Sequence, residues 1–394
     1  MKKDRVSRGR VLFILNDAPF FVSHRLVLAV AARDAGFEVH VAVAHDPAAV
    51  ATIEAAGLNH HDIPLKRGAR RPLGELRLIV RLAGLIRSLR PDLVHTVTMK
   101  PALYGGGLAR LLRVPAAVNA ITGLGYLFLI EGALARLQRA IIKRLYRVAL
   151  GHPNSRAIFQ NPDDLNLFVE NGLVDPGNAV IVKGTGVDME KYRVLPEPKG
   201  GLTVMFPARV IGDKGIHEFV AAAKAFQSKG LQARFIIVGR TDPDNPTDVG
   251  EPTIRQWERE GLVEWWGFSN DMADTLPKAH IVCMPSYREG LPRVLIEAAA
   301  CGRAIVTADV PGCREIVKDG ENGILIPARD GIATAGAIER LLDDPKLRKR
   351  MASRSREIAE SEYAMDRFIA DTLAVYEVVL PRKPNAAVAE STIA

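Results

Sequence analysis

Short apolar runs rich in β-branched residues alternate with longer segments of helical periodicity in the first half of the chain. The runs at 11–16, 39–44, 93–98 and 117–122 predict strands, and the segment 73–89 predicts a helix between two of them. Strands that are separated by helices in this way form parallel sheets, because each helix returns the chain to the same edge. The first half therefore predicts one open, doubly wound sheet.

The same pattern starts again after the breaker-rich segment Pro-Glu-Pro-Lys-Gly-Gly at 196–201. Six further strands are predicted, at 203–207, 235–239, 263–266, 281–285, 304–307 and 323–326. We therefore expect an α/β protein with two Rossmann-like domains at 1–188 and 189–380, whose last helix can pack back on the first domain. The segment 381–394 lacks periodicity and is expected to be a disordered tail. Two sheets of this type favour ligands at the carboxyl ends of the strands, in a cleft that the two domains face.

Composition narrows the class of protein. With 48% hydrophobic and 25% charged residues among 394, the chain is typical of a globular protein with sizeable cores. Three cysteines without a CxxC pair imply neither a disulfide framework nor a zinc site, and no segment suits a signal peptide or a membrane span, so a cytoplasmic protein is expected. A net charge of +8 favours anionic partners, but no helix-turn-helix or aromatic-interleaved basic run supports nucleic acid among them.

The segment from Arg288 to Gly302 carries the clearest chemistry. Pro292 suits the first position of a helix and Gly302 suits its end. The free N–H groups at the helix start favour an anion, and Gly290 lets backbone amides approach a pyrophosphate. Glu297 lies among apolar residues, where an unpaired carboxylate is costly, so the paired hydroxyls of a ribose are its expected partners. The alternative is that Glu297 lies at an exposed edge and that the nearby acid is a solvated loop residue.

Two cations follow the first predicted strand of the second domain. Arg209 and Lys214 lie five residues apart in a glycine-containing loop that leads into a predicted helix at 216–226. A planar guanidinium and a compact ammonium suit a diphosphate leaving group, whose developing charge they can neutralise. The alternative is a pair of surface cations beside a turn.

Glu289 followed eight residues later by Glu297, with Arg209 and Lys214 upstream, resembles glycosyltransferase family 4, whose members are retaining enzymes of the GT-B fold. The segment Gly-Thr-Gly-Val-Asp at 184–188 is similar to the family's crossover between domains. The resemblance implies that the two cations hold the donor diphosphate, that Glu289 contacts the transferred sugar and that Glu297 binds ribose. It also implies donor contacts from the backbone of Gly290, Leu291 and Pro292.

The first half is similar to the bacterial branch of this family that extends undecaprenyl-diphosphate-linked sugars for surface glycans. The similar segments are those at 92–96, 100–101, 104–106 and 121–125. They imply a UDP-sugar donor whose sugar, by resemblance to the family, is an N-acetylhexosamine. They also imply a lipid-linked acceptor bound through His95, Lys100, Thr122 and Gly123. Many members have a histidine at the position of Thr122, so His95 or His24 is a candidate substitute, and a structural role for His95 stays open.

A basic amphipathic helix is predicted at 126–150. Its apolar stripe consists of Leu134, Leu137, Ile141, Leu145 and Val148. Its cations, on the opposite side, are Arg136, Arg139, Lys143 and Arg147. The stripe is expected to pack on its own domain, and the basic face, together with Lys66, Arg67, Arg70 and Arg71, predicts peripheral attachment to an anionic membrane surface on the cytoplasmic face of the inner membrane.

Neither a metal nor another cofactor is expected, because the two cations supply positive charge and a donor phosphate can take the acceptor proton in front-face attack. Asp242-Pro243-Asp244 has the form DxD, but the loop around it is rich in ordinary turn residues. Two alternatives to the lipid-linked transferase stay open: a nucleotide-sugar epimerase on the same scaffold and a transferase with a soluble acceptor. A dehydrogenase is disfavoured, because no G-x-G-x-x-G follows the first strand.

Overall fold

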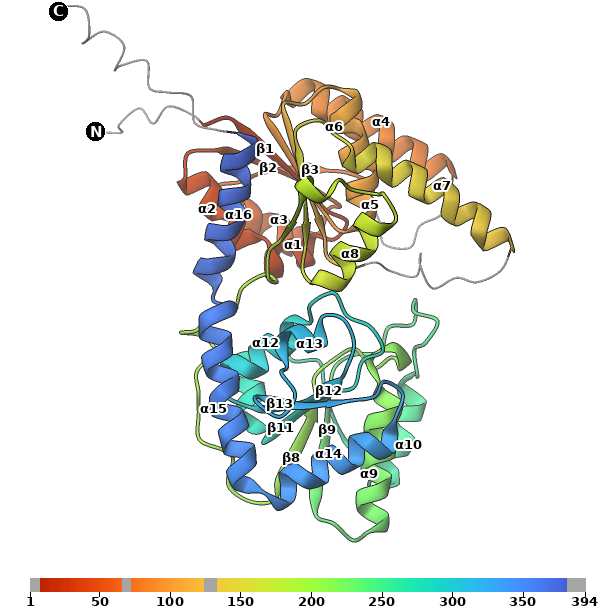
Figure 1. Ribbon diagram of the computed structural model, residues 1–394, viewed down its shortest axis with the longest axis vertical. Helices are drawn as coiled ribbons and strands as arrows, with labels where there is room; N and C mark the ends of the chain where they lie inside the picture. The colour runs from red at the N-terminus through yellow and green to blue at the C-terminus, as the bar shows by residue number, and fades with distance from the viewer. Residues whose placement is uncertain (1–7, 66–71, 124–132, 381–394) are drawn as a thin grey trace, which may run out of the picture. The chain divides into compact units, whose positions relative to one another are not determined.

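The computed structural model describes residues 8–65, 72–123 and 133–380, and the chain divides into two compact units (Figure 1). The first unit comprises Met1–Val182 and Ile369–Ala394, and the second comprises Lys183–Phe368. The chain therefore passes from one unit to the other twice, and most of the last helix belongs to the first unit. The predicted boundary at 188–189 falls shortly after the first crossing, and the predicted tail lies outside the described residues.

The first unit is built on a parallel sheet of seven strands in the order β3-β2-β1-β4-β5-β6-β7. The central strands β1, β4 and β5 are buried almost throughout, because helices cover both faces of the sheet (Figure 1). The strands are β1 (Arg10–Ile14), β2 (Glu38–Val43), β3 (Asn59–Asp62), β4 (Leu93–Val97), β5 (Ala116–Ile121), β6 (Ser155–Phe159) and β7 (Ala179–Ile181).

Alternate side chains of these strands enter two different cores. Leu12 and Ile14 pack with helix α4 (Pro72–Leu89), whereas Phe13, between them, contacts Phe21 of α1 (Ala18–His24) and the ring of His95. The helical segments of this unit are α1 (Ala18–His24), α2 (Leu26–Asp34), α3 (Pro47–Ala55), α4 (Pro72–Leu89), α5 (Met99–Pro101), η1 (Ala102–Gly106), α6 (Gly107–Leu111), α7 (Ala133–Leu150), α8 (Pro162–Glu170), η3 (Pro176–Asn178) and most of α16 (Met365–Val379).

The second unit repeats this arrangement with six parallel strands in the order β10-β9-β8-β11-β12-β13. The strands are β8 (Leu202–Phe206), β9 (Ala233–Val238), β10 (Glu264–Gly267), β11 (Ile281–Met284), β12 (Ala304–Ala308) and β13 (Gly323–Ile326). The helical segments are η4 (Gly212–Lys214), α9 (Ile216–Ser228), α10 (Glu251–Arg259), α11 (Met272–Thr275), η5 (Leu276–Lys278), α12 (Arg293–Ala300), α13 (Cys313–Ile316), α14 (Gly331–Asp343) and α15 (Pro345–Glu362). The prediction of two doubly wound parallel sheets is confirmed.

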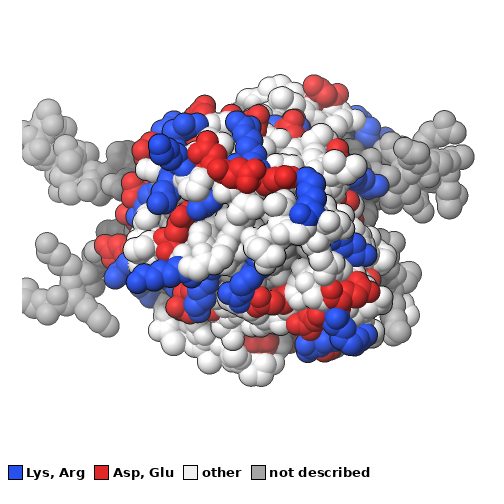
Figure 2. Space-filling view, turned by 90° about the horizontal axis from the view of Figure 1, so that it is seen from below, with Lys and Arg blue, Asp and Glu red and all other residues white. Residues whose placement is uncertain are grey.

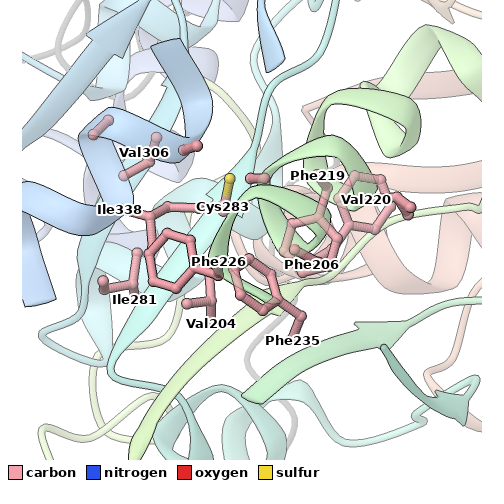
Figure 3. Close-up of a cluster of buried hydrophobic side chains, with 14 of the residues drawn as sticks. Val204, Phe206, Phe219, Val220, Phe226, Phe235, Ile281, Cys283, Val306 and Ile338 are labelled. Atoms are coloured by element: carbon pink, nitrogen blue, oxygen red, sulfur yellow. The ribbon is translucent and has the colours of Figure 1, made fainter. Parts of the chain in front are cut away.

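Aromatic side chains fill the core beneath one face of the second sheet (Figure 3). The ring of Phe219, from α9, lies with its centroid 5.4 Å from that of Phe206 and 5.3 Å from that of Phe235. The adjacent strand residue Met205 points to the other face, where it joins α12 and the end of α15. The sheet is therefore held from both sides, and its carboxyl edge is a rigid support for the loops that follow.

The amphipathic helix differs from the prediction in which side it buries. The described part is α7, and among its side chains at 141–150 those of Tyr146, Ala149 and Leu150 are buried, whereas Ile141, Leu145 and Val148 of the predicted apolar stripe are exposed. The expectation that this stripe packs on its own domain is therefore wrong for these three residues. The tyrosine decides the orientation, because its ring packs against Phe168 and its hydroxyl donates to the Met99 carbonyl. Residues 66–71 and 126–132 lie outside the described residues.

Candidate active site

The strand order of the second sheet reverses between β8 and β11, which lie next to each other. At such a switch point the two following loops leave toward opposite faces, and the space between them is where open α/β sheets bind ligands. Arg209 and Lys214 follow β8, and Glu289 follows β11. The structure therefore brings three of the predicted donor residues to one place at the carboxyl edge.

Backbone contacts fix the loop after β8 against the loop after β11. The Tyr287 N–H donates to the Asp213 carbonyl at 2.9 Å. Gly215 has a φ of 79°, and a Cβ there would lie 2.1 Å from the Pro285 carbonyl oxygen, so the approach requires glycine. The two loops are consequently fixed in position relative to each other before any ligand binds.

The result is an ion pair between Lys214 and Glu289. Only 20% of the lysine side chain and 11% of the glutamate side chain are exposed. Both charges are thus largely withdrawn from water and compensate each other. Lys214 and Glu289 therefore already lie side by side. The lysine ammonium would meet a donor diphosphate, and the glutamate carboxylate would meet its sugar.

Arg209 is paired in a similar way, with Asp242. The loop that carries this aspartate is ordered by its own hydrogen bonds: the Asp242 N–H donates to Asp248 Oδ1 at 2.8 Å, and the Asn245 N–H donates to the Asp242 carbonyl. The first carboxylate of the DxD sequence is therefore the counter-charge of the arginine. Within the described parts of the chain, no group of three or more His, Cys, Asp or Glu could hold a metal ion.

Glu297 is buried on α12, with 7% of its surface exposed, and it has protein partners. The Tyr192 hydroxyl and the Arg293 Nε both donate to its Oε1, each at 2.8 Å. Burial raises the pKa of Glu297, while the charge of Arg293 and the two hydrogen bonds oppose that rise. The prediction that this carboxylate is buried is confirmed, its partners in the structure are Tyr192 and Arg293, and its contact with ribose hydroxyls stays a prediction.

The start of α12 lies one residue later than predicted. Pro292 is the N-cap, with φ −73° and ψ 104°, and Arg293 is the first helical residue. Leu291 and Pro292 are buried, so their side chains serve packing and only their backbone could meet a donor. The backbone at Gly290 packs closely on Gly312, where a Cβ would lie 2.4 Å from the Gly290 carbonyl oxygen. Gly302, with a φ of 61°, follows the end of the helix as predicted.

In the first unit, His95 is not at the carboxyl edge but inside the core. It is 1% exposed, its Nδ1 is hydrogen bonded to the Tyr376 hydroxyl, and its ring stacks on Phe13 at 4.9 Å. Burial, with a smaller contribution from the nearby charge of Arg25, lowers the pKa of His95 to about 3. The prediction that His95 contacts an acceptor is therefore corrected: the imidazole is a neutral core group that joins β4 to α16.

The other predicted acceptor residues do lie near the carboxyl edge of the first sheet. Thr122 and Gly123 follow β5 and are partly exposed, and Lys100 follows β4 and forms a 2.7 Å ion pair with Glu75. His24, at the end of α1, stacks on Phe20 at 4.1 Å and its Nδ1 is 2.7 Å from the Ser23 hydroxyl. The structure thus gathers residues of this set without defining a reacting group among them.

Sequence reasoning missed one residue on this edge. Thr98, directly after β4, has φ 75° and ψ 165°, a conformation that threonine rarely adopts. Its buried hydroxyl has no hydrogen-bond partner among the described residues. Strain and an unsatisfied polar atom together are features that functional sites often keep. No sequence signal marks this position, because the strain arises only from the turn into α5.

Two parallel doubly wound units, with paired cations and carboxylates at the switch point of the second, form the arrangement expected of a GT-B glycosyltransferase. Comparison with known proteins agrees. The model of the family "Glycosyl transferases group 1" matches residues 188–358, and that of "Glycosyl transferase 4-like" matches residues 10–152. The chain belongs to the family 4-like glycosyltransferases.

Related proteins support the assignment to glycosyltransferases, and a solved structure supports the GT-B fold. A Campylobacter jejuni N,N'-diacetylbacillosaminyl-diphospho-undecaprenol alpha-1,3-N-acetylgalactosaminyltransferase is 26% identical over 87% of this chain and 92% of its own length. An Escherichia coli UDP-Gal:alpha-D-GlcNAc-diphosphoundecaprenol alpha-1,3-galactosyltransferase is 24% identical over 69% of this chain and 72% of its own. The fold is that of an Anabaena protein crystallised with UDP and glucose, with a TM-score of 0.72 at 20% identity over 93% of this chain and 99% of that one.

None of the helices in residues 8–65, 72–123 and 133–380 combines the length and apolar character needed to cross a membrane.

Proposed function

We propose that the protein transfers a sugar, an N-acetylhexosamine, from a UDP-sugar to a saccharide carried on undecaprenyl diphosphate, with retention at the anomeric carbon, during synthesis of a surface glycan. Relatives that act on diphospho-undecaprenol sugars and a fold neighbour that holds UDP support this choice. The observation that carries it is the set of paired charges at the β8–β11 switch point.

The chemistry follows from what a donor would do to these pairs. The diphosphate would take the place of the two carboxylates beside Lys214 and Arg209, and the cations would then stabilise the charge that develops as UDP leaves. Glu289, released from the lysine, would lie where the transferred sugar enters. A phosphate oxygen of the donor accepts the proton of the attacking hydroxyl, so the reaction needs no metal.

A panel of nucleotide sugars, incubated with and without undecaprenyl-diphosphate-linked sugars, tests this function through the mass of the products. Transfer by the wild type and near-complete loss in Glu297→Ala and Lys214→Ala are expected. Unimpaired transfer in both variants would overturn the site. Isomerisation of the donor without any acceptor would favour the epimerase, and transfer only to soluble sugars would favour a soluble acceptor.

A lipid-linked acceptor requires the enzyme to reach a membrane surface, and the first unit carries an exposed apolar surface suited to this. Among the described side chains of α4, α6 and α7, seven large apolar ones are exposed: Leu73, Leu76, Val80, Leu111, Ile141, Leu145 and Val148. On α4 and α7 they recur at spacings of three and four residues, and α6 contacts both helices. We call this set the apolar docking surface. A patch of this kind on a monomer marks an interaction site.

Charge favours an anionic lipid bilayer as the partner of the apolar docking surface. The sequence of α7 contains five Lys or Arg and no Asp or Glu, and the exposed Arg77, Arg81, Arg110 and Arg113 lie on or beside α4 and α6. Elsewhere the signs mix: Figure 2 shows a face on which Lys and Arg are interspersed with Asp and Glu. Each cation near an acidic membrane contributes about 1 kcal/mol of attraction, and inserted apolar side chains add to it.

Vesicle flotation tests the apolar docking surface separately from catalysis. We expect the wild type to float with vesicles that contain phosphatidylglycerol at low salt, and the double variant Leu76→Asp, Leu145→Asp to stay at the bottom. The matched control is Ile332→Asp in the second unit, where the side chain is 88% exposed, and it should float as the wild type does. Equal flotation of the double variant would reject the surface. Loss of a dimer without loss of flotation would assign it to self-association.

A further inference from the structure

The proposed ribose carboxylate is held by two side chains at one of its oxygens. Tyr192 Oη and Arg293 Nε both donate to Glu297 Oε1 at 2.8 Å, and neither uses Oε2. Arg293 lies on the same helix, one turn earlier, but Tyr192 comes from the segment that enters the second unit. The geometry of this carboxylate thus depends on a residue 105 positions away along the chain.

The backbone around Tyr192 is fastened on both sides. Its N–H donates to the Asp188 carbonyl at 2.9 Å, and its carbonyl accepts from Arg356 Nη1 at 2.6 Å. The same guanidinium nitrogen donates to the Ala300 carbonyl, the last residue of α12, at 2.6 Å. One arginine therefore ties the turn that carries Tyr192 to the helix that carries Glu297. The ring is 5% exposed within the core of that face, so the hydroxyl has little freedom.

The surroundings of the Tyr192 hydroxyl keep it protonated, so that it stays a hydrogen-bond donor to Glu297. Burial raises the pKa of Tyr192, and the neighbouring Glu297 charge raises it further, so the phenol keeps its proton throughout the physiological range. Burial also raises the pKa of Glu297, and the tyrosine bond is one of the contacts that oppose this. An ionised carboxylate is acceptor-only with about two lone pairs on each oxygen, so Oε2 can accept from both ribose hydroxyls while Oε1 accepts from Tyr192 and Arg293.

We propose that Tyr192 is a positioning residue of the donor site: with Arg293 it occupies Oε1 of Glu297, fixes the plane of the carboxylate and leaves Oε2 to the ribose hydroxyls of the nucleotide. The proposal rests on the proposed role of Glu297 in binding ribose. Tyr192 itself does not touch the nucleotide. Its removal should therefore alter how well the site recognises the ribose and leave the diphosphate contacts intact.

Tyr192→Phe tests this, with the binding of UDP and of 2′-deoxy-UDP measured by calorimetry. The wild type should prefer UDP, because the deoxy analogue lacks one hydroxyl for Glu297. We expect the variant to bind UDP about tenfold more weakly, as for the loss of a hydrogen bond to a charged group, and 2′-deoxy-UDP nearly as before. As the pH falls from 8 to 5, the variant should lose its affinity for UDP at a higher pH than the wild type does, because the pKa of Glu297 is higher without the hydrogen bond from the tyrosine.

The matched control is Tyr363→Phe. The Tyr363 hydroxyl is also in this core and donates to the Glu315 carbonyl at 2.8 Å, away from Glu297. This variant should lose stability but keep the preference for UDP. In a Glu297→Gln background, Tyr192→Phe should have little further effect on UDP binding, because the pair acts as a unit.

The outcomes separate the two proposals. If Glu297→Gln binds UDP as tightly as the wild type, the assignment of the ribose site fails. If Glu297→Gln weakens UDP but Tyr192→Phe binds it normally, or weakens UDP and 2′-deoxy-UDP equally, the role of Tyr192 is overturned.

Discussion

The two units have the same sheet order around their first strands, yet the carboxyl edges of their sheets hold polar groups very differently. In the second unit, cations and carboxylates from separate loops are already paired: Lys214 with Glu289, and Arg209 with Asp242. In the first unit, Lys100 pairs with Glu75 at this edge, beside the strained Thr98. The most conspicuous titratable group on its strands, His95, is buried beneath α16.

This difference has a physical cause. A diphosphate carries concentrated charge, so its site needs cations that are held in place beforehand, and counter-carboxylates keep such cations ordered and partly desolvated until the ligand exchanges with them. The reacting sugar of the proposed acceptor is neutral and presents hydroxyls, which loops with mixed polar atoms can bind, whereas the acceptor's diphosphate joins that saccharide to the lipid. The donor side is therefore recognisable from its charges, and the acceptor side is not.

The largest expected effect comes from removing the second unit's ammonium. Lys214→Ala should lower kcat by about 100- to 1,000-fold, as for the loss of a group that stabilises a leaving charge. The matched variant Lys100→Ala, which breaks the ion pair of the first unit, should lower it by less than about tenfold. Turnover of the UDP-sugar with thermal unfolding as a folding control measures both. A larger loss in Lys100→Ala would reverse the contrast between the units.

His95 should contribute to stability rather than to chemistry. Its pKa is lowered to about 3 in the folded protein, against about 6.5 in an unfolded chain, so its contribution is present above pH 6.5 and is lost as the pH falls toward 3. In urea unfolding between pH 7 and 5, the wild type should lose more stability than His95→Gln, in which Arg25 and Tyr376 face a neutral amide. The pKa values of His61 and His280 are also lowered, but both residues are present in both proteins, so their contributions to the pH dependence of stability cancel in the comparison. Equal pH slopes, or loss of turnover in His95→Gln, would contradict this.

A smaller effect is expected from the counter-charge of Arg209. Asp242→Asn should bind UDP about threefold more tightly at low salt, because the diphosphate no longer competes with a carboxylate, and the gain should shrink as salt screens the charges. Calorimetry at two salt concentrations measures it. Weaker binding that magnesium restores would instead make Asp242 a metal ligand.

The smallest effect is expected from a chelator. Turnover after treatment with EDTA should stay within about twofold of the untreated enzyme, because Lys214 and Arg209 supply the charge that a metal would otherwise bring. Complete loss that only magnesium or manganese reverses would show that these cations are insufficient.

Much of the fold could be predicted from the sequence, and the reasons are local. Apolar runs marked the central strands β4, β5, β11 and β12 within one or two residues. Three strands of the first sheet were missed: β6, where Arg156 interrupts the apolar run, and the edge strands β3 and β7, because Asn59–Asp62 is polar and Ala179–Ile181 is only three residues long. The predicted orientation of α7 was wrong, because the contacts of the single residue Tyr146 fix the helix with part of its apolar stripe facing outward.

By itself the sequence predicted the two parallel sheets, the switch-point loops and the candidate donor residues, since periodicity, glycine and proline positions and the spacing of Glu289 and Glu297 are local properties. The tertiary structure alone decided the partners: that Glu297 is shared with Tyr192, that Arg209 opposes Asp242 and that His95 is enclosed by α16. These are contacts between residues distant along the chain. Their energies depend on burial and orientation, which exist only once the sheets have formed and packed.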